Sequence, residues 1–365
     1  MISPLAFISA AIASAMALLV VSATKKWHKE TEADMTALCD EIKTGSSEHV
    51  NETTNLKGLP LPIQRHLQIS LGLASPDEAV RRIKMLSINQ QGRFLLNGKW
   101  IDFTARQLFS ASDANPGFVW EANMKLPMFS LFGRSLVTLP IHVKDAYVNG
   151  RGTMVGKLLG ALTIVDMRDT PVLNEGELSR WLGECIVFPT ALIPAGRKNG
   201  QKLRWKDSED YDTNEETATV TAILEGAPCK TSDGTKHDVK TEIEFRCSKD
   251  TGLIHSIYAM RPYAEPGQKD AKMLPWEVSK LYQRCTRMYM YVPILTCITR
   301  FPFIYISLGF DLSIYQINIA QGHFSDYQTR QGILVPTRME VGWWKDGDLE
   351  LYFQGQNHAF DFHFE

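Results

Sequence analysis

Residues 174–194 read Asn-Glu-Gly-Glu-Leu-Ser-Arg-Trp-Leu-Gly-Glu-Cys-Ile-Val-Phe-Pro-Thr-Ala-Leu-Ile-Pro, and the predicted fold is built around them. Four apolar residues recur at i, i+3, i+4 and i+7, which is the spacing of one helix face: Leu178, Trp181, Leu182 and Cys185. Glu177, Arg180 and Glu184 share another face at spacings that permit ion pairs. Asn174 can cap the first turn. The stretch predicts a helix at the centre of the core, and its two prolines predict an extended, buried segment after that helix.

Alternating apolar and polar residues flank this helix on both sides. Before it, the alternation runs through residues 101–106 and 118–126. After it, the alternation returns in residues 217–224 and 242–247, which a Thr-Ser-Asp-Gly turn at 231–234 joins as a hairpin, and in residues 335–343, 349–353 and 360–364. A period of two is typical of strands with one packed and one wet face. A second helix is predicted over 63–71, ending near Gly72.

These patterns predict a mainly β, α+β fold, in which a curved antiparallel sheet or part-barrel encloses one or more helices. The length of 365 residues and the hydrophobic content of 44% suffice for a large core. The formal net charge is only −2, with acids and bases interspersed, so the sequence gives no sign of a nucleic-acid partner. Six cysteines without CxxC spacing are interpreted as mostly free thiols.

The N-terminus carries an uncharged run over residues 4–23, rich in Ala, Leu, Ile and Val. About 20 helical residues match a hydrocarbon core of roughly 30 Å, so the run predicts a membrane helix. A cleaved signal peptide is the alternative, because Val21-Ser22-Ala23 resembles a cleavage site. We expect a single-pass membrane protein. Its side of the membrane is left open, since three lysines directly after the run argue for the cytoplasm and a sequon at 51–53 argues against it.

Three regions follow from this: an anchor or signal over 1–24, a polar stalk over 25–58 with a short helix at 30–42, and a single β-rich domain over 59–365. The domain carries an apolar insertion near 285–320. Within it, residues 288–310 are far more apolar than their surroundings, but Pro293, Arg300 and Pro302 disfavour a second spanning helix. We expect either a buried hairpin or an element lying on the bilayer surface.

An ordered series of short motifs runs from Leu59 to Tyr352, and each motif is weak alone. The series includes LPxPxQR from Leu59, QGxF from Gln91, PGFxW from Pro116, GELxRWLxE from Gly176 and FPTALxP from Phe188. Together they resemble an uncharacterised, often membrane-anchored family that is known only as a domain of unknown function. The resemblance implies a shared fold and an anchor. It implies no activity, cofactor or substrate, and the 288–310 segment departs from its pattern.

No catalytic or metal signature is present. The sequence has no HExxH motif and no GxSxG elbow, and the glycine-rich run at 150–157 lacks the spacing of a phosphate loop. We therefore predict no catalytic residue, no metal site and no cofactor. Arg180 and Glu184, four residues apart, are either a structural salt bridge, which we favour, or a pair that orients a ligand or acts as acid and base. Arg106 and Asp145 are candidates to join this pair.

The predicted ligand-binding residues are Trp100, Arg106, Phe118, Trp120, Arg180, Trp181 and Glu184. The aromatic members either line a concave surface for an apolar guest or fill the core. We expect a membrane-anchored protein that binds or carries a hydrophobic ligand of the lipid class. Two alternatives are an enzyme that uses Arg180 and Glu184, and a non-catalytic scaffold at the membrane. The sequence names no protein partner.

Overall fold

The structure is a computed structural model, and it describes residues 4–45, 55–96, 98–113, 115–131, 134–194, 202–207, 216–230, 236–259, 262–263, 272–273, 320–345 and 348–364. The apolar segment predicted at 288–310 and the turn predicted at 231–234 lie outside these ranges.

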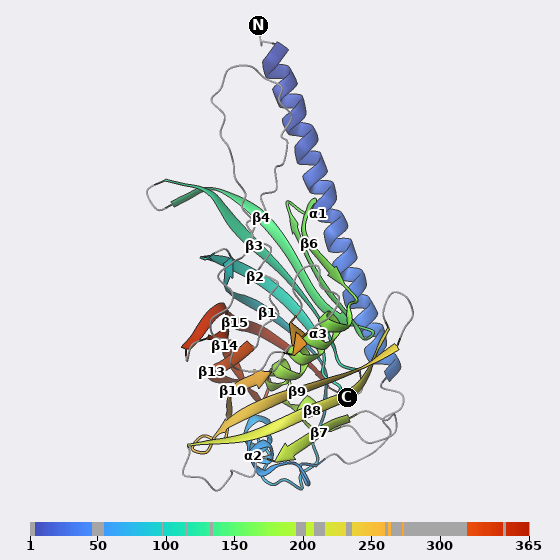
Figure 1. The fold of residues 1–365 in the computed structure, drawn as a ribbon, viewed down its shortest axis with the longest axis vertical. Helices are drawn as coiled ribbons and strands as arrows, with labels where there is room; N and C mark the ends of the chain where they lie inside the picture. The colour runs from blue at the N-terminus through green and yellow to red at the C-terminus, as the bar shows by residue number, and fades with distance from the viewer. Residues whose placement is uncertain are drawn as a thin grey trace.

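In the described part of the chain, thirteen strands form one curved antiparallel sheet, and two short strands form a separate pair (Figure 1). The strands of the sheet are β1 (Ile83–Leu96), β2 (Lys99–Ser110), β3 (Gly117–Leu131), β4 (Arg134–Val148), β5 (Arg151–Leu158), β6 (Leu162–Arg168), β7 (Lys202–Asp207), β8 (Thr217–Lys230), β9 (Lys236–Ser248), β10 (Ile254–Ala259), β13 (Ala320–Arg330), β14 (Ile333–Lys345) and β15 (Asp348–Phe364). The separate pair is β11 (Pro262–Tyr263) with β12 (Lys272–Met273).

The strand order is β6-β5-β4-β3-β2-β1-β15-β14-β13-β10-β9-β8-β7. The chain enters the middle of the sheet at β1 and winds out to the edge strand β6. It then crosses to the opposite edge, β7, and returns strand by strand until β15 pairs with β1. The helix α3 (Pro171–Glu184) and the short 3-10 helices η2 (Cys185–Val187) and η3 (Pro189–Leu192) form that crossing. The central helix is therefore the connection between the two edges.

The helix α3 lies in the hollow of the sheet, and the helix α1 (Pro4–Gly45) runs along the other side (Figure 1). We call the side of α3 the inner face and the side of α1 the outer face. Alternation along β3 separates them: Phe118 and Trp120 join the large core around α3, whereas Val119 packs with Leu38 of α1. The helix α2 (Leu61–Leu71) covers the inner face near β14 and β8 and ends at Gly72, as predicted.

The mainly β fold, with a curved sheet around helices, is confirmed, and three local predictions differ from the structure. The helix α3 begins at Pro171 with Thr170 as its cap, so Asn174 lies inside the helix. The segment after α3 is wound into η2 and η3 instead of being extended, although it is buried as expected. Residues 349–364 belong to one long strand, β15, because an irregularity at Ala359 lets the strand continue past a change of alternation.

The N-terminal region differs most from the prediction. The stalk is helical as far as Gly45, since α1 is one continuous helix whose second half packs against the sheet. Within the described ranges, no helix contains a stretch long and apolar enough to cross a membrane. The predicted spanning helix over 4–23 is therefore not supported. The apolar part of α1 passes within a few residues into a charged sequence that holds Lys25, Lys26 and Lys29.

Candidate functional site

Helix α3 is held against both halves of the sheet by close contacts at glycines. On β5, a Cβ at Gly152 would lie 3.0 Å from the Leu173 side chain, and the Gly152 amide donates to Oδ1 of Asn174 at 2.6 Å. On the helix itself, a Cβ at Gly183 would lie 2.7 Å from the side chain of Ile257 on β10. Because no larger residue fits at either point without movement, the helix has one position in the hollow.

A row of three side chains crosses the inner face beneath α3. Gln107 on β2, Trp120 on β3 and Asp145 on β4 are register partners and point to the same side. Arg180 of α3 lies over the row, with its guanidinium carbon 5.3 Å from the centre of the Trp120 ring and 4.7 Å from that of Phe118. These distances suit cation–π contacts in a desolvated setting.

Arg180 holds two carboxylates. Its Nε donates to Glu184 Oε1 at 2.8 Å, and its Nη1 donates to Asp145 Oδ2. Burial disfavours the charged guanidinium, but the charges of Glu184, Asp145 and Glu177 outweigh burial and raise the pKa of Arg180. The arginine therefore remains charged and ties α3 to β4.

Glu184 is fully engaged in this network. Its second oxygen, Oε2, accepts from Gln107 Nε2 at 2.8 Å. A carboxylate that uses one oxygen for an arginine and the other for an amide is oriented as a structural partner, so the salt-bridge interpretation of the Arg180–Glu184 pair fits the geometry. Two buried acceptors beside it, Oε1 of Gln107 and Oδ1 of Asp145, have no hydrogen-bond partner among the described residues.

Beyond α3, toward the ends of β1–β4 and β15, several apolar side chains of the inner face are only partly buried. A chain of aromatic contacts leads there: Phe103 lies 5.8 Å from Trp120 and stacks on Phe353 at 5.4 Å, and Phe353 lies 6.5 Å from Phe94. Five apolar side chains of this region are packed against the core yet only partly buried, and we call them the open apolar strip: Phe94, Leu96, Leu126, Leu139 and Phe353. Among the described residues, most of the apolar side chains next to α3 are by contrast fully buried.

The structure brings five of the seven predicted site residues together. Phe118, Trp120, Arg180 and Glu184 meet as described, and Trp181 lies deeper, where its Nε1 donates to the carbonyl of Ser110 at 2.8 Å. The open apolar strip was not predicted as a site, although its alternation with polar neighbours was visible in the sequence. Whether any of these residues binds a ligand stays a prediction.

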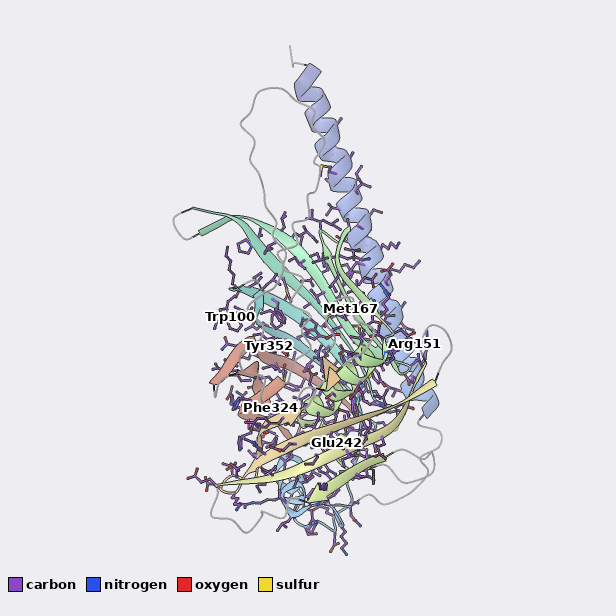
Figure 2. All side chains as sticks on the ribbon, in the orientation of Figure 1. Trp100, Arg151, Met167, Glu242, Phe324 and Tyr352 are labelled. Carbon is purple, nitrogen blue, oxygen red and sulfur yellow. The ribbon has the colours of Figure 1, made fainter. Side chains whose placement is uncertain are left out.

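Trp100 and Arg106 lie on the outer face and do not join the Arg180 network. Both alternate on β2 with Phe103, which belongs to the inner core, so the parity of the sequence already separated them from it. Trp100, near the start of β2, is 39% exposed (Figure 2). Arg106 instead donates to Glu32 of α1 at 2.6 Å and to Glu121 of β3 at 2.7 Å.

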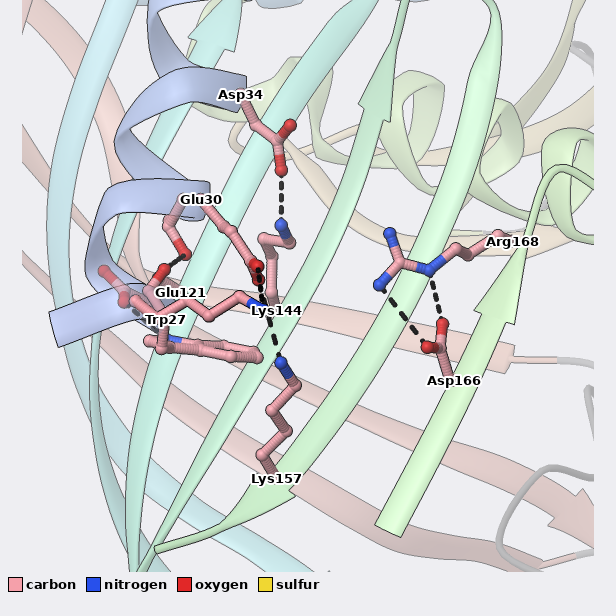
Figure 3. A network of polar contacts seen from close by, with 10 residues as sticks. Trp27, Glu30, Asp34, Glu121, Lys144, Lys157, Asp166 and Arg168 are labelled. Atoms are coloured by element: carbon pink, nitrogen blue, oxygen red, sulfur yellow. Dashed lines mark hydrogen bonds and ion pairs between the residues drawn. The ribbon is translucent and has the colours of Figure 1, made fainter. Parts of the chain in front are cut away.

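The outer face holds a second polar network, beneath α1, that sequence reasoning missed. Trp27 is buried and donates from Nε1 to Glu121 Oε1 at 2.8 Å, and Lys144 and Lys157 each lie within 6 Å of its ring (Figure 3). Lys144 pairs with Asp34, and Lys157 lies 3.7 Å from Glu30. The only signal for it was a tryptophan within a stretch that otherwise resembled a polar stalk.

Within the described ranges, no group of three or more His, Cys, Asp or Glu side chains is placed to hold a metal ion. Cys39, Cys185 and Cys247 are free thiols, and burial raises the pKa of Cys247 to about 12. These thiols are accordingly protonated near neutral pH.

Residues 48–292 match the model of a family described as "Family of unknown function (DUF6544)". This match confirms the resemblance seen in the motif series. The comparison with curated proteins found no match.

Among solved structures, the chain is similar to a LolA superfamily protein from Nitrosomonas europaea, with 9% identity, a TM-score of 0.31 and coverage of 83% of this chain and 92% of that one. It is also similar to a DUF1329 family protein from Desulfovibrio piger, with 9% identity, a TM-score of 0.32 and coverage of 83% and 93%. A putative outer membrane lipoprotein-sorting protein domain from Vibrio parahaemolyticus shows 5% identity, a TM-score of 0.31 and coverage of 76% and 85%. Similarities at this level support no conclusion about the present chain.

Proposed function

Because the chain belongs to the family of unknown function DUF6544, which carries no assigned activity, we propose its function from the molecule itself: it binds a hydrophobic small molecule of the lipid class on the open apolar strip. The observation that carries the proposal is the contrast along the inner face. Under α3 the apolar side chains are fully buried, whereas Phe94, Leu96, Leu126, Leu139 and Phe353 remain partly exposed.

The shape of the strip favours an elongated apolar occupant. Its residues lie on β1, β3, β4 and β15, which are neighbours or near neighbours in the sheet, and the aromatic contacts from Trp120 to Phe94 continue it inward. Burying about eight methylene groups there would contribute roughly 6 kcal/mol before the costs of association. That is enough for reversible binding of an acyl chain.

Polar groups lie at the inner end of the strip. Trp120 connects the aromatic chain to Arg180 and to the two unpartnered acceptors, Gln107 Oε1 and Asp145 Oδ1. Because Trp120 and both acceptors are buried, an occupant of the strip would contact the aromatic surface and not these acceptors.

The proposal includes contact with a membrane surface. At the N-terminal end of α1, four apolar side chains are more than half exposed, the largest fraction being the 71% of Leu18: Met16, Leu18, Leu19 and Val21. Lys25 and Lys26 follow about one helical turn later, as expected for a helix segment that contacts lipid with its apolar side and anionic head groups with its lysines. The full chain should float with anionic vesicles, and Leu18→Asp with Leu19→Asp should abolish flotation.

Lipid binding is tested with the full chain after delipidation, by titration with the fluorescent fatty acid cis-parinaric acid. Leu139→Glu places a charge on the strip and should weaken binding at least about tenfold, the effect of roughly 1.4 kcal/mol. Thr138→Glu is the matched control. Thr138 is the exposed neighbour of Leu139 on β4 and points to the other face, so this variant adds the same charge away from the strip. Trp120→Asp is unsuited to the test, since Trp120 is 95% buried and donates to Gln90.

The result that would overturn the proposal is a wild-type chain that binds no parinaric acid, or a Leu139→Glu variant that binds it as well as Thr138→Glu does. Native mass spectrometry of the chain purified without detergent gives an independent reading, since a carrier should retain co-extracted lipid. A lipid-free protein in both experiments would leave the scaffold alternative as the better one.

A further inference from the structure

The outer face holds an open groove of about 630 Å³ beside α1, on the opposite side of the sheet from the proposed lipid site. One wall is the helix, through His28 and Glu32. The floor and the other walls come from β1, β2, β3 and β15. The volume lies within the range of about 300–1,000 Å³ that small-molecule sites occupy.

The charged groups of the groove are already paired with one another. Arg106 lies between Glu32 and Glu121, with N–O distances of 2.6 and 2.7 Å, and Nδ1 of His28 lies 3.1 Å from Glu121. Arg106 cannot recruit an anion without breaking these pairs, and each carboxylate already has Arg106 as a cationic partner. The groove therefore suits a neutral ligand.

The remaining polar lining consists of groups that both donate and accept hydrogen bonds. Asn89 and Gln91 on β1, Thr104 on β2 and Asn123 on β3 lie at outer-face positions along the groove. Amides and hydroxyls match a partner that carries many hydroxyl groups, because each hydroxyl is also a donor and an acceptor. The paired charges and the amide and hydroxyl lining together describe a neutral, hydroxyl-rich molecule.

An irregularity in the sheet shapes one wall. Asn89 pairs with His358, but two positions earlier Ser87 pairs with Asp361, so β15 carries one extra residue there. Ala359 absorbs it with a φ of 44°, a conformation that favours glycine. The bulge turns His358 toward the outer face, and Nε2 of His358 is buried with no hydrogen-bond partner in the part of the chain that the structure describes. Sheets often carry bulges where a side chain is redirected beside a functional site.

We propose that this groove is a binding site for a neutral saccharide. The outer face of β2 continues from Thr104 to the exposed ring of Trp100, four residues and about 13 Å away at the usual strand rise, so a short oligosaccharide could reach from the groove to a flat aromatic surface. The same chemistry is offered by a free sugar and by the head group of a glycolipid.

The experiment uses the full chain and saturation-transfer NMR with maltotriose, chitotriose and galactobiose, and with inorganic phosphate and spermidine as charged probes. Transfer to at least one neutral saccharide is expected. Gln91→Leu and Asn123→Leu should each weaken binding roughly tenfold, the loss expected for one or two hydrogen bonds. Gln356→Leu is the matched control, because Gln356 pairs with Gln91 across the strands but does not line the groove.

A second readout is hydrogen exchange of α1. Since His28 and Glu32 form a wall, a bound saccharide should slow the exchange of amides in residues 24–36 and leave those of α2 unchanged. Vesicles that carry a digalactosyl lipid, compared with free galactobiose, show which source of the sugar binds more tightly.

The inference is overturned if no saccharide shows transfer, if phosphate or spermidine binds in their place, or if Gln356→Leu weakens binding as much as Gln91→Leu. Its failure is separable from that of the lipid proposal, since Asn123→Leu should leave parinaric acid binding unchanged and Leu139→Glu should leave saccharide binding unchanged.

Discussion

The two faces of β3 solve the same packing problem with different chemistry. On the inner face, Phe118 and Trp120 meet α3, and the helix contributes the cation Arg180 above their rings. On the outer face, Glu121 is buried beneath α1 although it is a strand residue with polar neighbours, and it accepts from Trp27 and Arg106. The inner face is mainly aromatic and buries one ion-paired network, to which α3 contributes Arg180 and Glu184 and the sheet contributes Asp145. The outer face buries charged side chains of the sheet, and α1 contributes one buried tryptophan, Trp27, to it.

The difference shows that the alternation of residues along a strand determines which face a side chain occupies. It does not determine whether that face is exposed to solvent. A strand with Glu121 and a neighbour with Lys144 are typical of solvent exposure, and both side chains are less than a tenth exposed. They tolerate burial because α1 supplies Trp27 and Asp34 as partners. The outer face is thus a second interior whose stability depends on ion pairing.

The largest effect is expected on the inner face from Arg180→Met. Removing the guanidinium leaves Asp145 and Glu184 without their cation in a buried site, which costs about 3–5 kcal/mol of unfolding free energy. Urea denaturation followed by tryptophan fluorescence measures it. Arg180→Lys, which keeps the charge, should lose less. If Arg180→Met and Arg180→Lys lower the unfolding free energy equally, the charge of Arg180 does not stabilise the fold. The inner face would then depend on packing alone.

The next effect is a pH dependence located at α2. Burial lowers the pKa of His66 to about 3 from its ordinary 6.5, and its Nδ1 accepts from the Ile254 amide at 3.3 Å. Between pH 6.5 and 3, His66 takes up a proton in the unfolded chain but not in the folded one. The free energy of unfolding therefore keeps its full value above pH 6.5 and decreases as the pH falls toward 3. At pH 4.5 the decrease is about 3 kcal/mol.

His66→Asn tests this dependence, because the amide oxygen replaces the acceptor but cannot titrate. Its unfolding free energy should vary less between pH 7 and 4.5 than that of the wild type. An unchanged pH slope in the variant would assign the acid sensitivity to other groups, among which His142 also has a pKa lowered by burial and by His28.

On the outer face, Trp27→Phe removes the indole donor to Glu121 and keeps most of the apolar contact. Loss of a hydrogen bond to a buried carboxylate costs about 1.5–3 kcal/mol. Because α1 is attached to the sheet by one side only, the loss should appear as faster hydrogen exchange in residues 24–45 and not as a large shift of the main unfolding transition. A uniform increase over the whole sheet would mean that α1 and the sheet unfold as one unit.

The smallest expected effect concerns the bulge. Ala359→Gly relieves a left-handed conformation at an exposed position and should stabilise the chain by up to about 1 kcal/mol. Ala359→Val should destabilise it. Thermal unfolding compares the three proteins, and a destabilised glycine variant would show that Ala359 contributes contacts that outweigh its strain.

Much of the local structure could be predicted from the sequence. Residues 63–71 and 178–185 carry a helical period, and both lie in or at the end of helices. Alternation in 118–126 correctly placed Phe118 and Trp120 on one face, and the four-residue spacing of Arg180 and Glu184 is the spacing at which they pair. The motif series also identified the family. These features need only a few neighbouring residues.

The rest depended on contacts between distant parts of the chain. No local pattern specifies that β1 pairs with β15, more than two hundred residues later, or that α3 crosses from one edge of the sheet to the other. Residues 25–45 resembled a polar stalk because their partners, Glu121, Lys144 and Lys157, lie on three separate strands.

Local sequence patterns are therefore enough to predict most helices and strands and the side chains that share a face, since backbone periodicity depends on neighbouring residues alone. Which face each helix covers follows instead from contacts between distant parts of the chain. These contacts bury Glu121 and Lys144, leave the open apolar strip partly exposed and bring Asp145 to Arg180. Burial and charge pairing depend on what approaches a face from elsewhere in the chain, and a local pattern does not contain that information.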